Sequence, residues 1–133
     1  MKITKRRLDD ITFRQAPNRD VGEVFSAKSF GAPNVTFRIV DLAPLSMQKP
    51  RHPHRHEGFE EVIHFLQGSG RIWAEGEWYD VGAGDTILIP PGVVHATFNV
   101  EDRPMRLLCF FPRPDIDPFS IVDENVTLDL VAP

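Results

Sequence analysis

The amino-acid sequence predicts a single all-β domain, built as a sandwich or a barrel. Twelve prolines and nine glycines interrupt short apolar runs, and no segment keeps a helical repeat of apolar residues over a dozen positions. Between these runs lie turn-forming sequences such as GSG, GAGD and PPG, which is the pattern of proteins made of many short strands. A chain of 133 residues is long enough to bury one hydrophobic core.

Seven strands are expected from runs of β-branched, aromatic and aliphatic residues. Two of them flank Gly76 and should form a tight hairpin, because glycine tolerates the positive φ that such turns require. The end of the chain, 112–133, mixes prolines and acids with short apolar runs, and we expect it either to drape over the barrel or to reach a partner subunit. The expected strands are 35–42, 61–67, 70–75, 77–81, 85–90, 95–100 and 105–111.

The charge and the apolar pattern exclude several classes of protein. A net charge of −4 and a pI near 5.7 argue against binding to nucleic acid or to an anionic membrane. No apolar run approaches the roughly 18 residues of a membrane span, and no apolar segment follows the basic N-terminal residues as in a secretory signal. The single cysteine, Cys109, excludes an internal disulfide and is expected to be a buried, inert thiol. We therefore expect a cytoplasmic protein.

Three of the five histidines lie within five positions, in the stretch RHPHRHEGFEE at 51–61. Residues two apart on an extended chain point to the same face, so His54 and His56 could grip one metal ion. Glu61 could add a carboxylate after a short bend. His52 is expected to be a solvated residue at the rim, although a role as spare ligand or as a base beside the metal stays open. By itself the cluster is also compatible with an exposed loop.

The stretch GDTILIPPGVVHATFN supplies a second motif. In the first stretch, His-x-His is followed by four residues, Glu, six residues and Gly. In the second, Gly is followed by five residues, Pro-x-Gly, two residues, His, three residues and Asn. This order resembles the two motifs of the cupin superfamily, with the short spacing of small single-domain members. One departure is Gln48, which stands where the family has a glycine and removes no ligand. The matching residues are His54, His56, Glu61 and Gly68 in motif 54–68, and Gly84, Pro90, Gly92, His95 and Asn99 in motif 84–99.

The resemblance implies a jelly-roll barrel (double-stranded β-helix) formed by one cupin domain over 1–133, with one divalent transition metal inside. His54, His56, Glu61 and His95 match the metal ligands of the family. Three imidazoles and a carboxylate suit Fe, Mn, Ni, Cu or Zn. An ion with six ligands would keep two positions open, and open positions are typical of catalytic metal sites. No organic cofactor is expected, and no catalytic residue is assigned beyond the ligands.

Strand alternation predicts where the neighbours of Glu61 point. Ile63 and Phe65 share its face and should form an apolar cavity wall, whereas His64 should point away from the metal. Asn99 is expected to brace a turn or a strand end rather than to bind metal.

Three arginines are candidates for holding a carboxylate group of a substrate, because a guanidinium can bind a carboxylate through two hydrogen bonds. They are Arg38, Arg51 and Arg71, and surface exposure is the default expectation for each. The sequence leaves two alternatives for the strand at 70–75: either the face with Ile72 or the face with Arg71 points inward.

The leading functional hypothesis is a metal-dependent enzyme that cleaves an organic acid, ketone or phenolic compound in a dioxygenase-like reaction. Decarboxylase, lyase or isomerase chemistry at the same site is an alternative. A non-catalytic cupin that binds a small ligand or metal is another, and a metal-free epimerase or cyclase is disfavoured by the intact ligand set. The expected partners are a small molecule and a second copy of the chain, since pairing would protect an exposed sheet edge; no nucleic acid or membrane is expected.

Overall fold

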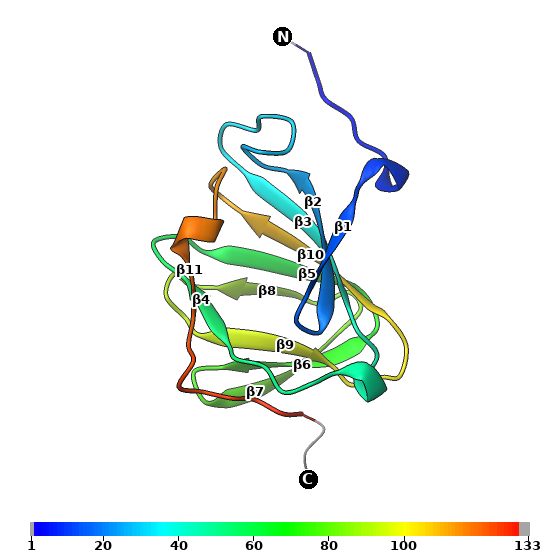
Figure 1. Ribbon diagram of the computed structural model, residues 1–133, viewed down its shortest axis with the longest axis vertical. Helices are drawn as coiled ribbons and strands as arrows, with labels where there is room; N and C mark the ends of the chain where they lie inside the picture. The colour runs from blue at the N-terminus through cyan, green and yellow to red at the C-terminus, as the bar shows by residue number, and fades with distance from the viewer. Residues whose placement is uncertain (1, 131–133) are drawn as a thin grey trace.

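The protein is a sandwich of two antiparallel β-sheets, as a computed structural model shows for residues 2–130 (Figure 1). The larger sheet has the strand order β1-β2-β3-β10-β5-β8, and the smaller sheet has the order β11-β4-β9-β6-β7. The sheets face each other as in a jelly roll but do not close into a continuous barrel. The strands are β1 (Phe13–Ala16), β2 (Arg19–Phe25), β3 (Thr36–Leu42), β4 (His54–His56), β5 (Glu61–Gln67), β6 (Ser69–Ala74), β7 (Glu77–Gly82), β8 (Thr86–Ile89), β9 (His95–Asn99), β10 (Met105–Phe111) and β11 (Ser120–Val122), and three short 3-10 turns are η1 (Leu8–Asp10), η2 (Leu45–Met47) and η3 (Asp117–Phe119).

The all-β prediction is confirmed, and the seven expected strands lie within one residue of β3, β5, β6, β7, β8, β9 and β10. The predicted hairpin joins β6 to β7, where Glu75 and Gly76 both have positive φ (49° and 88°). The histidine stretch contains a short strand, β4, that begins directly after Pro53. The sequence did not predict β1, β2 or β11, because their sequences are polar or only three residues long.

The N-terminal hairpin of β1 and β2 extends the larger sheet. Ala16 pairs with Arg19, so the connecting loop is Pro17 and Asn18. Proline sets the negative φ of the first loop residue, and Asn18 has a φ of 61°, which is the combination found in type II turns. This hairpin matters for the site because it places two basic side chains at the cavity between the sheets.

The main core fills the space between the sheets. Burial alternates along β5 and β10, so every second side chain of each strand enters this core. Ile72 of β6 also faces it, which settles the inward face of that strand. The buried members are Val21, Val40, Leu42, Phe59, Ile63, Phe65, Ile72, Val81, Ile89, Met105, Leu107, Cys109, Phe111 and Ile116.

A second apolar cluster covers the outer face of the smaller sheet. Phe98 of β9 is 1% exposed and packs with Trp73, Trp78 and Leu128. Leu128 belongs to the C-terminal segment, which exchanges backbone hydrogen bonds of 2.8 and 2.9 Å with Arg51. The C-terminal segment therefore lies along the sandwich up to residue 130.

Within residues 2–130, no helix has the length and apolar character needed to cross a membrane.

Candidate metal centre

The candidate ligands come from both sheets and meet in the space between them. His54 and His56 lie on β4, and His54 pairs in register with His95 on the neighbouring strand β9. Glu61 begins β5 of the opposite sheet, where alternation turns its side chain inward. Residues far apart in the sequence are thus brought together by strand pairing.

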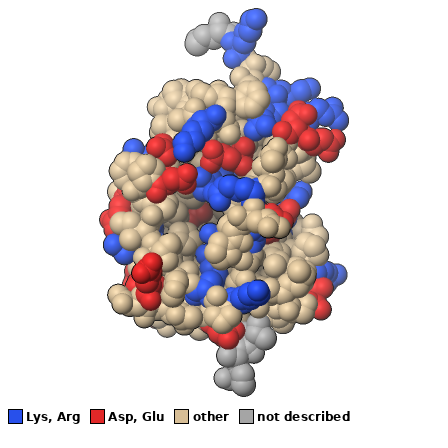
Figure 2. Space-filling view, viewed as in Figure 1, with Lys and Arg blue, Asp and Glu red and all other residues tan. Residues whose placement is uncertain are grey.

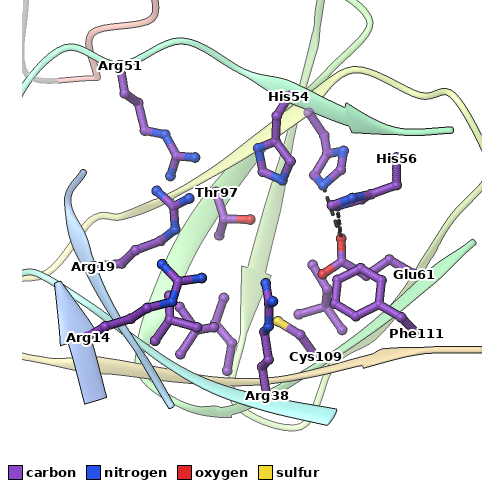
Figure 3. A pocket seen from close by; sticks show the side chains of 15 residues that line it. Arg14, Arg19, Arg38, Arg51, His54, His56, Glu61, Thr97, Cys109 and Phe111 are labelled. Atoms are coloured by element: carbon purple, nitrogen blue, oxygen red, sulfur yellow. Dashed lines mark hydrogen bonds and ion pairs between the residues drawn. The ribbon is translucent and has the colours of Figure 1, made fainter. Parts of the chain in front are cut away.

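Three of these side chains, the histidines, lie within reach of one metal ion, and Glu61 contacts two of them. One nitrogen from each of His54, His56 and His95 lies within 4.8 Å of the others. The Oε1 atom of Glu61 is 3.3 Å from Nε2 of His56 and 3.2 Å from Nε2 of His95, as the dashed lines in Figure 3 show. His56, Glu61 and His95 are at most 6% exposed.

Hydrogen bonds on the far side of two imidazoles fix which nitrogen faces the centre. Nδ1 of His95 is 2.9 Å from the carbonyl oxygen of Val93, and this oxygen can only accept. Nδ1 of His56 is 2.9 Å from Oγ of Ser120, which donates its own proton to the carbonyl of Ile116. Both Nδ1 atoms therefore donate, so in its neutral form each imidazole presents the lone pair of Nε2 to the centre.

This arrangement fits a cation at the centre. Two ring nitrogens converge on a carboxylate oxygen, and Nε2 of His56 is buried with no hydrogen-bond partner within residues 2–130. Bonds of about 2.1 Å from one metal ion to two ligands at right angles would place the ligand atoms about 3 Å apart, close to the observed 3.2 and 3.3 Å. A second hydrogen bond on each ligating histidine is also a usual feature of metal sites.

Electrostatics keep the ligands in the forms that bind metals. Burial alone would raise the pKa of Glu61, but the imidazoles of His56 and His95, 3.3 and 3.2 Å from its Oε1, outweigh it and hold that pKa well below its usual range. Burial, and then the charges of His95 and His56, lower the pKa of His54 well below its usual value. Glu61 is therefore ionised and His54 is neutral near pH 7.

The ligands open into a cavity of about 90 Å³ between the sheets. A wider mouth of about 380 Å³ shares the same arginines and leads to the surface. Apolar side chains of β2, β3, β5 and β10 form one wall, and four arginines stand opposite the histidines (Figure 3). The residues shared by cavity and mouth are Arg14, Arg19, Arg38, Arg51, His54 and His56.

Several predictions about neighbouring residues are confirmed. Ile63 lines the cavity as predicted, whereas Phe65, expected in the same wall, is fully buried in the adjoining core and does not line the cavity. His64 points away from the centre and bonds Oγ1 of Thr86 at 2.8 Å. His52 is exposed at the mouth, where its Nδ1 lies 2.7 Å from the carbonyl oxygen of Val126.

Asn99 braces a turn, as predicted. Its amide donates to the carbonyl oxygens of Ala43 (3.3 Å) and Arg103 (2.6 Å), and its Oδ1 accepts from the backbone of Glu101 (2.9 Å). Gln48, at the position where the family has a glycine, bonds the backbone N–H and carbonyl of Asn99 at 2.8 and 2.7 Å. Gln48 therefore replaces the glycine of the motif by a buried side chain that holds the backbone of Asn99.

Cys109 is buried beside Glu61, and burial followed by the charge of that carboxylate raises the pKa of its thiol well above the usual value. The expectation of a buried thiol is confirmed, and a raised pKa makes a thiol a poor nucleophile.

Two of the three arginine candidates lie at the cavity. Arg38 and Arg51 line it, whereas Arg71 lies on the outer face of the smaller sheet, pairs with Asp80 and stacks over Trp78. Arg71 is excluded as a cavity residue because strand alternation gives the inward side of β6 to its neighbour Ile72.

Arg14 and Arg19 are cavity residues that sequence reasoning missed. They stand on the unexpected hairpin of β1 and β2. The Pro-Asn turn between them was the available signal for that hairpin.

The arginines repel one another within the cavity wall. Burial, and then the charge of Arg19, lower the pKa of Arg51 to about 9. Burial and the charge of Arg14 also lower the pKa of Arg19. A group of guanidinium ions in such positions favours anions in the cavity.

Fold and site together define a class: a small two-sheet β-sandwich with three histidines and one glutamate gathered between the sheets. The family model described as a cupin domain matches residues 38–111, which is more than half of the chain. This chain belongs to the cupin domain family.

Among curated proteins, the chain is similar to two uncharacterized relatives. It is 38% identical over 56 residues to protein MJ1618 of Methanocaldococcus jannaschii, covering 42% of this chain and 45% of that protein. It is 33% identical over 63 residues to a protein of Aquifex aeolicus, covering 47% of this chain and 52% of that protein. The matched region spans about half the length of each relative.

Solved structures share the fold. Oxalate decarboxylase of Lactobacillus farciminis, in a formate complex, superposes with a TM-score of 0.73 at 24% identity, over 86% of this chain and 34% of that one. A variant of the Bacillus subtilis oxalate decarboxylase superposes with a TM-score of 0.72 at 19% identity, over 87% of this chain and 31% of that one. Streptomyces PAC13 with uridine superposes with a TM-score of 0.73 at 14% identity, over 92% of both chains. At these identities the likeness shows the fold alone.

Proposed function

We propose that this protein is a metal-dependent enzyme that acts on a small organic acid bound between its two sheets. The observation that carries the proposal is the convergence of two Nε2 atoms on the Glu61 carboxylate, 3.2 and 3.3 Å away, with a nitrogen of His54 within 4.8 Å of those of His56 and His95. Three imidazoles and one carboxylate suit Fe, Mn, Ni, Cu or Zn. When bound, such an ion would supply Lewis-acid chemistry by polarising a substrate oxygen.

The chain's own residues have distinct tasks in this proposal. Ser120 and the carbonyl of Val93 hold two imidazoles in the tautomer that binds a metal, and Glu61 supplies negative charge. Arg38 and Arg51 stand where a substrate carboxylate can lie opposite the ligands. The apolar wall lowers the local dielectric constant on one side of that space, which strengthens these electrostatic interactions.

We favour cleavage of a C–C bond next to a carboxylate, in the dioxygen-dependent form expected for this ligand set. The arginines support an organic acid rather than a neutral ketone or phenol, because a guanidinium binds a carboxylate through paired hydrogen bonds. Decarboxylation without oxygen consumption is the second candidate. It is the activity named for the Lactobacillus and Bacillus neighbours, and it also requires a carboxylate held beside the ligand group.

Metal content is the first test. Protein purified without a tag should contain about one transition-metal ion per chain by inductively coupled plasma mass spectrometry. His54→Ala, Glu61→Ala and His95→Ala should each lose most of it, since each removes one ligand. His64→Ala is the matched control, because it removes an imidazole three residues from Glu61 that points away from the centre, and it should keep the metal. Equal metal content in all four variants would refute the assignment.

A second test separates an enzyme from a binding protein. An enzyme needs an exchangeable coordination position, so nitric oxide should change the electron paramagnetic resonance signal of Fe(II)-loaded protein. Loaded protein should then be screened with organic acids for oxygen consumption and for release of carbon dioxide. Oxygen uptake supports oxidative cleavage, and carbon dioxide without oxygen uptake supports decarboxylation. A metal centre that no small ligand perturbs would favour the non-catalytic alternative.

A further inference from the structure

Four arginine side chains face the candidate ligands across the cavity. Arg14 stands on β1, Arg19 on β2, Arg38 on β3, and Arg51 shortly before β4. Figure 3 shows their side chains converging on the space in front of His54. In Figure 2, basic side chains gather in the middle of the viewed face, between the places of β1 and β4. The arginines therefore form one group that is reached from the surface through the mouth.

Only one of these arginines has a carboxylate partner. Arg38 binds Oε1 of Glu23 at 2.7 Å and Oδ1 of Asp117 at 3.1 Å. The other three, Arg14, Arg19 and Arg51, form no ion pair with any carboxylate in the described part of the chain, residues 2–130.

Arg51 is the most informative of the three. Its side chain is buried, with the residue 7% exposed, and its Nε atom has no hydrogen-bond partner among the described residues. Two backbone hydrogen bonds to Leu128 hold it in this position. A buried charge is costly unless an opposite charge or hydrogen bonds compensate it. The fold thus fixes a largely buried guanidinium at the cavity, positioned to bind an anion that enters through the mouth.

We propose that Arg14, Arg19 and Arg51 form an anion subsite, and that the substrate is a small dianion with one anionic group at the metal ligands and a second, carboxylate or phosphate, at these arginines. The subsite's role in substrate binding rests on the proposed metal-dependent function, whereas anion binding by the arginines does not. The only carboxylate that lines the inner cavity among residues 2–130, Glu61, belongs to the ligand group, so no described acid of the chain competes for the arginines there.

The cavity limits the size of this dianion. Its volume of about 90 Å³ favours a short molecule between the ligands and the arginines. Val21, Val40 and Leu107 make much of the cavity wall apolar, and Thr97 adds one hydroxyl, which offers few partners for a polyhydroxylated spacer. The structure therefore favours anionic groups joined by a short apolar linker.

The first arm of the test measures anion binding without metal. Metal-free protein in chloride-free buffer is titrated with inorganic phosphate and with acetate by isothermal titration calorimetry. Phosphate should bind at least about tenfold more weakly to Arg51→Met and Arg19→Met than to the parent chain. Arg71→Met is the matched control, because Arg71 lies outside the cavity, and it should bind as the parent does. A His54→Ala/His95→Ala variant should also keep phosphate binding.

The second arm tests the bridging dianion in metal-loaded protein. Malonate, succinate, glutarate and phosphoglycolate are compared with acetate. At least one dianion should bind about tenfold or more tightly than acetate, and Arg51→Met should abolish that advantage. Tighter binding of phosphoglycolate assigns a phosphate to the subsite, and tighter binding of a dicarboxylate assigns a carboxylate.

The outcomes separate the two proposals. Phosphate binding that depends on Arg51 in a chain that holds no metal would support the anion subsite and overturn the metal-dependent function. Metal binding without any preference for dianions would leave the function standing and overturn this inference. Equal phosphate binding by parent, Arg51→Met and Arg19→Met would also overturn it. Circular dichroism checks folding, and the exposed Arg14→Met serves as the test variant if Arg51→Met unfolds.

Discussion

Ser120 decides the orientation of an imidazole that lies 64 positions away along the chain. Its hydroxyl accepts from Nδ1 of His56 at 2.9 Å and donates to the carbonyl of Ile116 at 2.9 Å. The acceptor role leaves the Nε2 lone pair of His56 directed at the centre. At the residue scale, the site therefore depends on groups beyond the four candidate ligands, as is usual for metal sites.

The Ser120→Ala variant should bind metal about 10- to 100-fold more weakly, because His56 loses the acceptor that fixes its tautomer and ring orientation. A chelator competition titration measures this change. Thr86→Ala is the control, since it removes the hydroxyl next to Nδ1 of His64, outside the site, and should leave the affinity unchanged. The same affinity in both variants would contradict the role given to Ser120.

Strand β9 connects the site to the fold at the scale of elements. All five of its residues are buried, so its inner face contributes His95 and Thr97 to the cavity while its outer face packs under the C-terminal segment. At its end, Asn99 joins three backbone segments through its side-chain hydrogen bonds to Ala43, Glu101 and Arg103 and its backbone bonds to Gln48. The strand is thus held on both faces and at one end, which keeps His95 in register with His54.

We expect Asn99→Ala to lower the free energy of unfolding by about 2–3 kcal/mol, because it leaves buried backbone donors and acceptors without partners. Urea unfolding followed by circular dichroism measures this loss. The exposed Asn125 offers the same substitution outside any such network, and Asn125→Ala should change stability by less than about 0.5 kcal/mol. A comparably small effect at Asn99 would show that the turn is held by other contacts.

At the scale of the whole molecule, one ion-pair group ties the N-terminal hairpin and turn η3 to the larger sheet. Arg38 on β3 bonds Glu23 on β2 and Asp117 at the start of η3. Burial alone would raise the pKa of Glu23, but the hydroxyl of Ser26 and the guanidinium of Arg38 outweigh it and lower that pKa below its usual 4.5. These contacts hold the hairpin that carries Arg14 and Arg19.

The lowered pKa predicts part of the acid sensitivity of the fold. Glu23 binds protons less readily when folded than when unfolded, so its contribution to stability is full above about pH 4.5 and is lost as the pH falls through the folded pKa. Glu23→Gln should therefore be less stable than the parent at pH 7 and should lose less stability between pH 5 and pH 3. Urea unfolding midpoints across this range measure the difference. An unchanged pH dependence would show that the carboxylate is not coupled to folding.

A second copy of the chain, a cytoplasmic location and the extent of the domain over 1–133 stay predictions. Strands β1 and β8 end the larger sheet, and β7 and β11 end the smaller one, so sheet edges for pairing exist. Size-exclusion chromatography with light scattering would measure the oligomeric state.

The sequence by itself determined the features that depend on local spacing. Successive side chains of an extended strand point to opposite faces. The sequence therefore predicted that Glu61 and Ile63 point inward and that His64 points outward. Positive φ at a tight turn requires a residue such as glycine, and Gly68, with φ of 92°, fills that role. The seven expected strands and the gathering of the four motif residues came from the same local rules together with the resemblance.

Only the tertiary structure decided which distant segments meet at the site. Arg14 and Arg19 reach the cavity because their hairpin pairs with β3, and Ser120 reaches His56 because β11 pairs with β4. The chemical character of each residue is local, but sheet order depends on how the whole chain buries its apolar surface. For this reason the sequence revealed the candidate metal ligands, while Arg14 and Arg19, two of the arginines at the anion-binding end of the cavity, became visible only in the folded molecule.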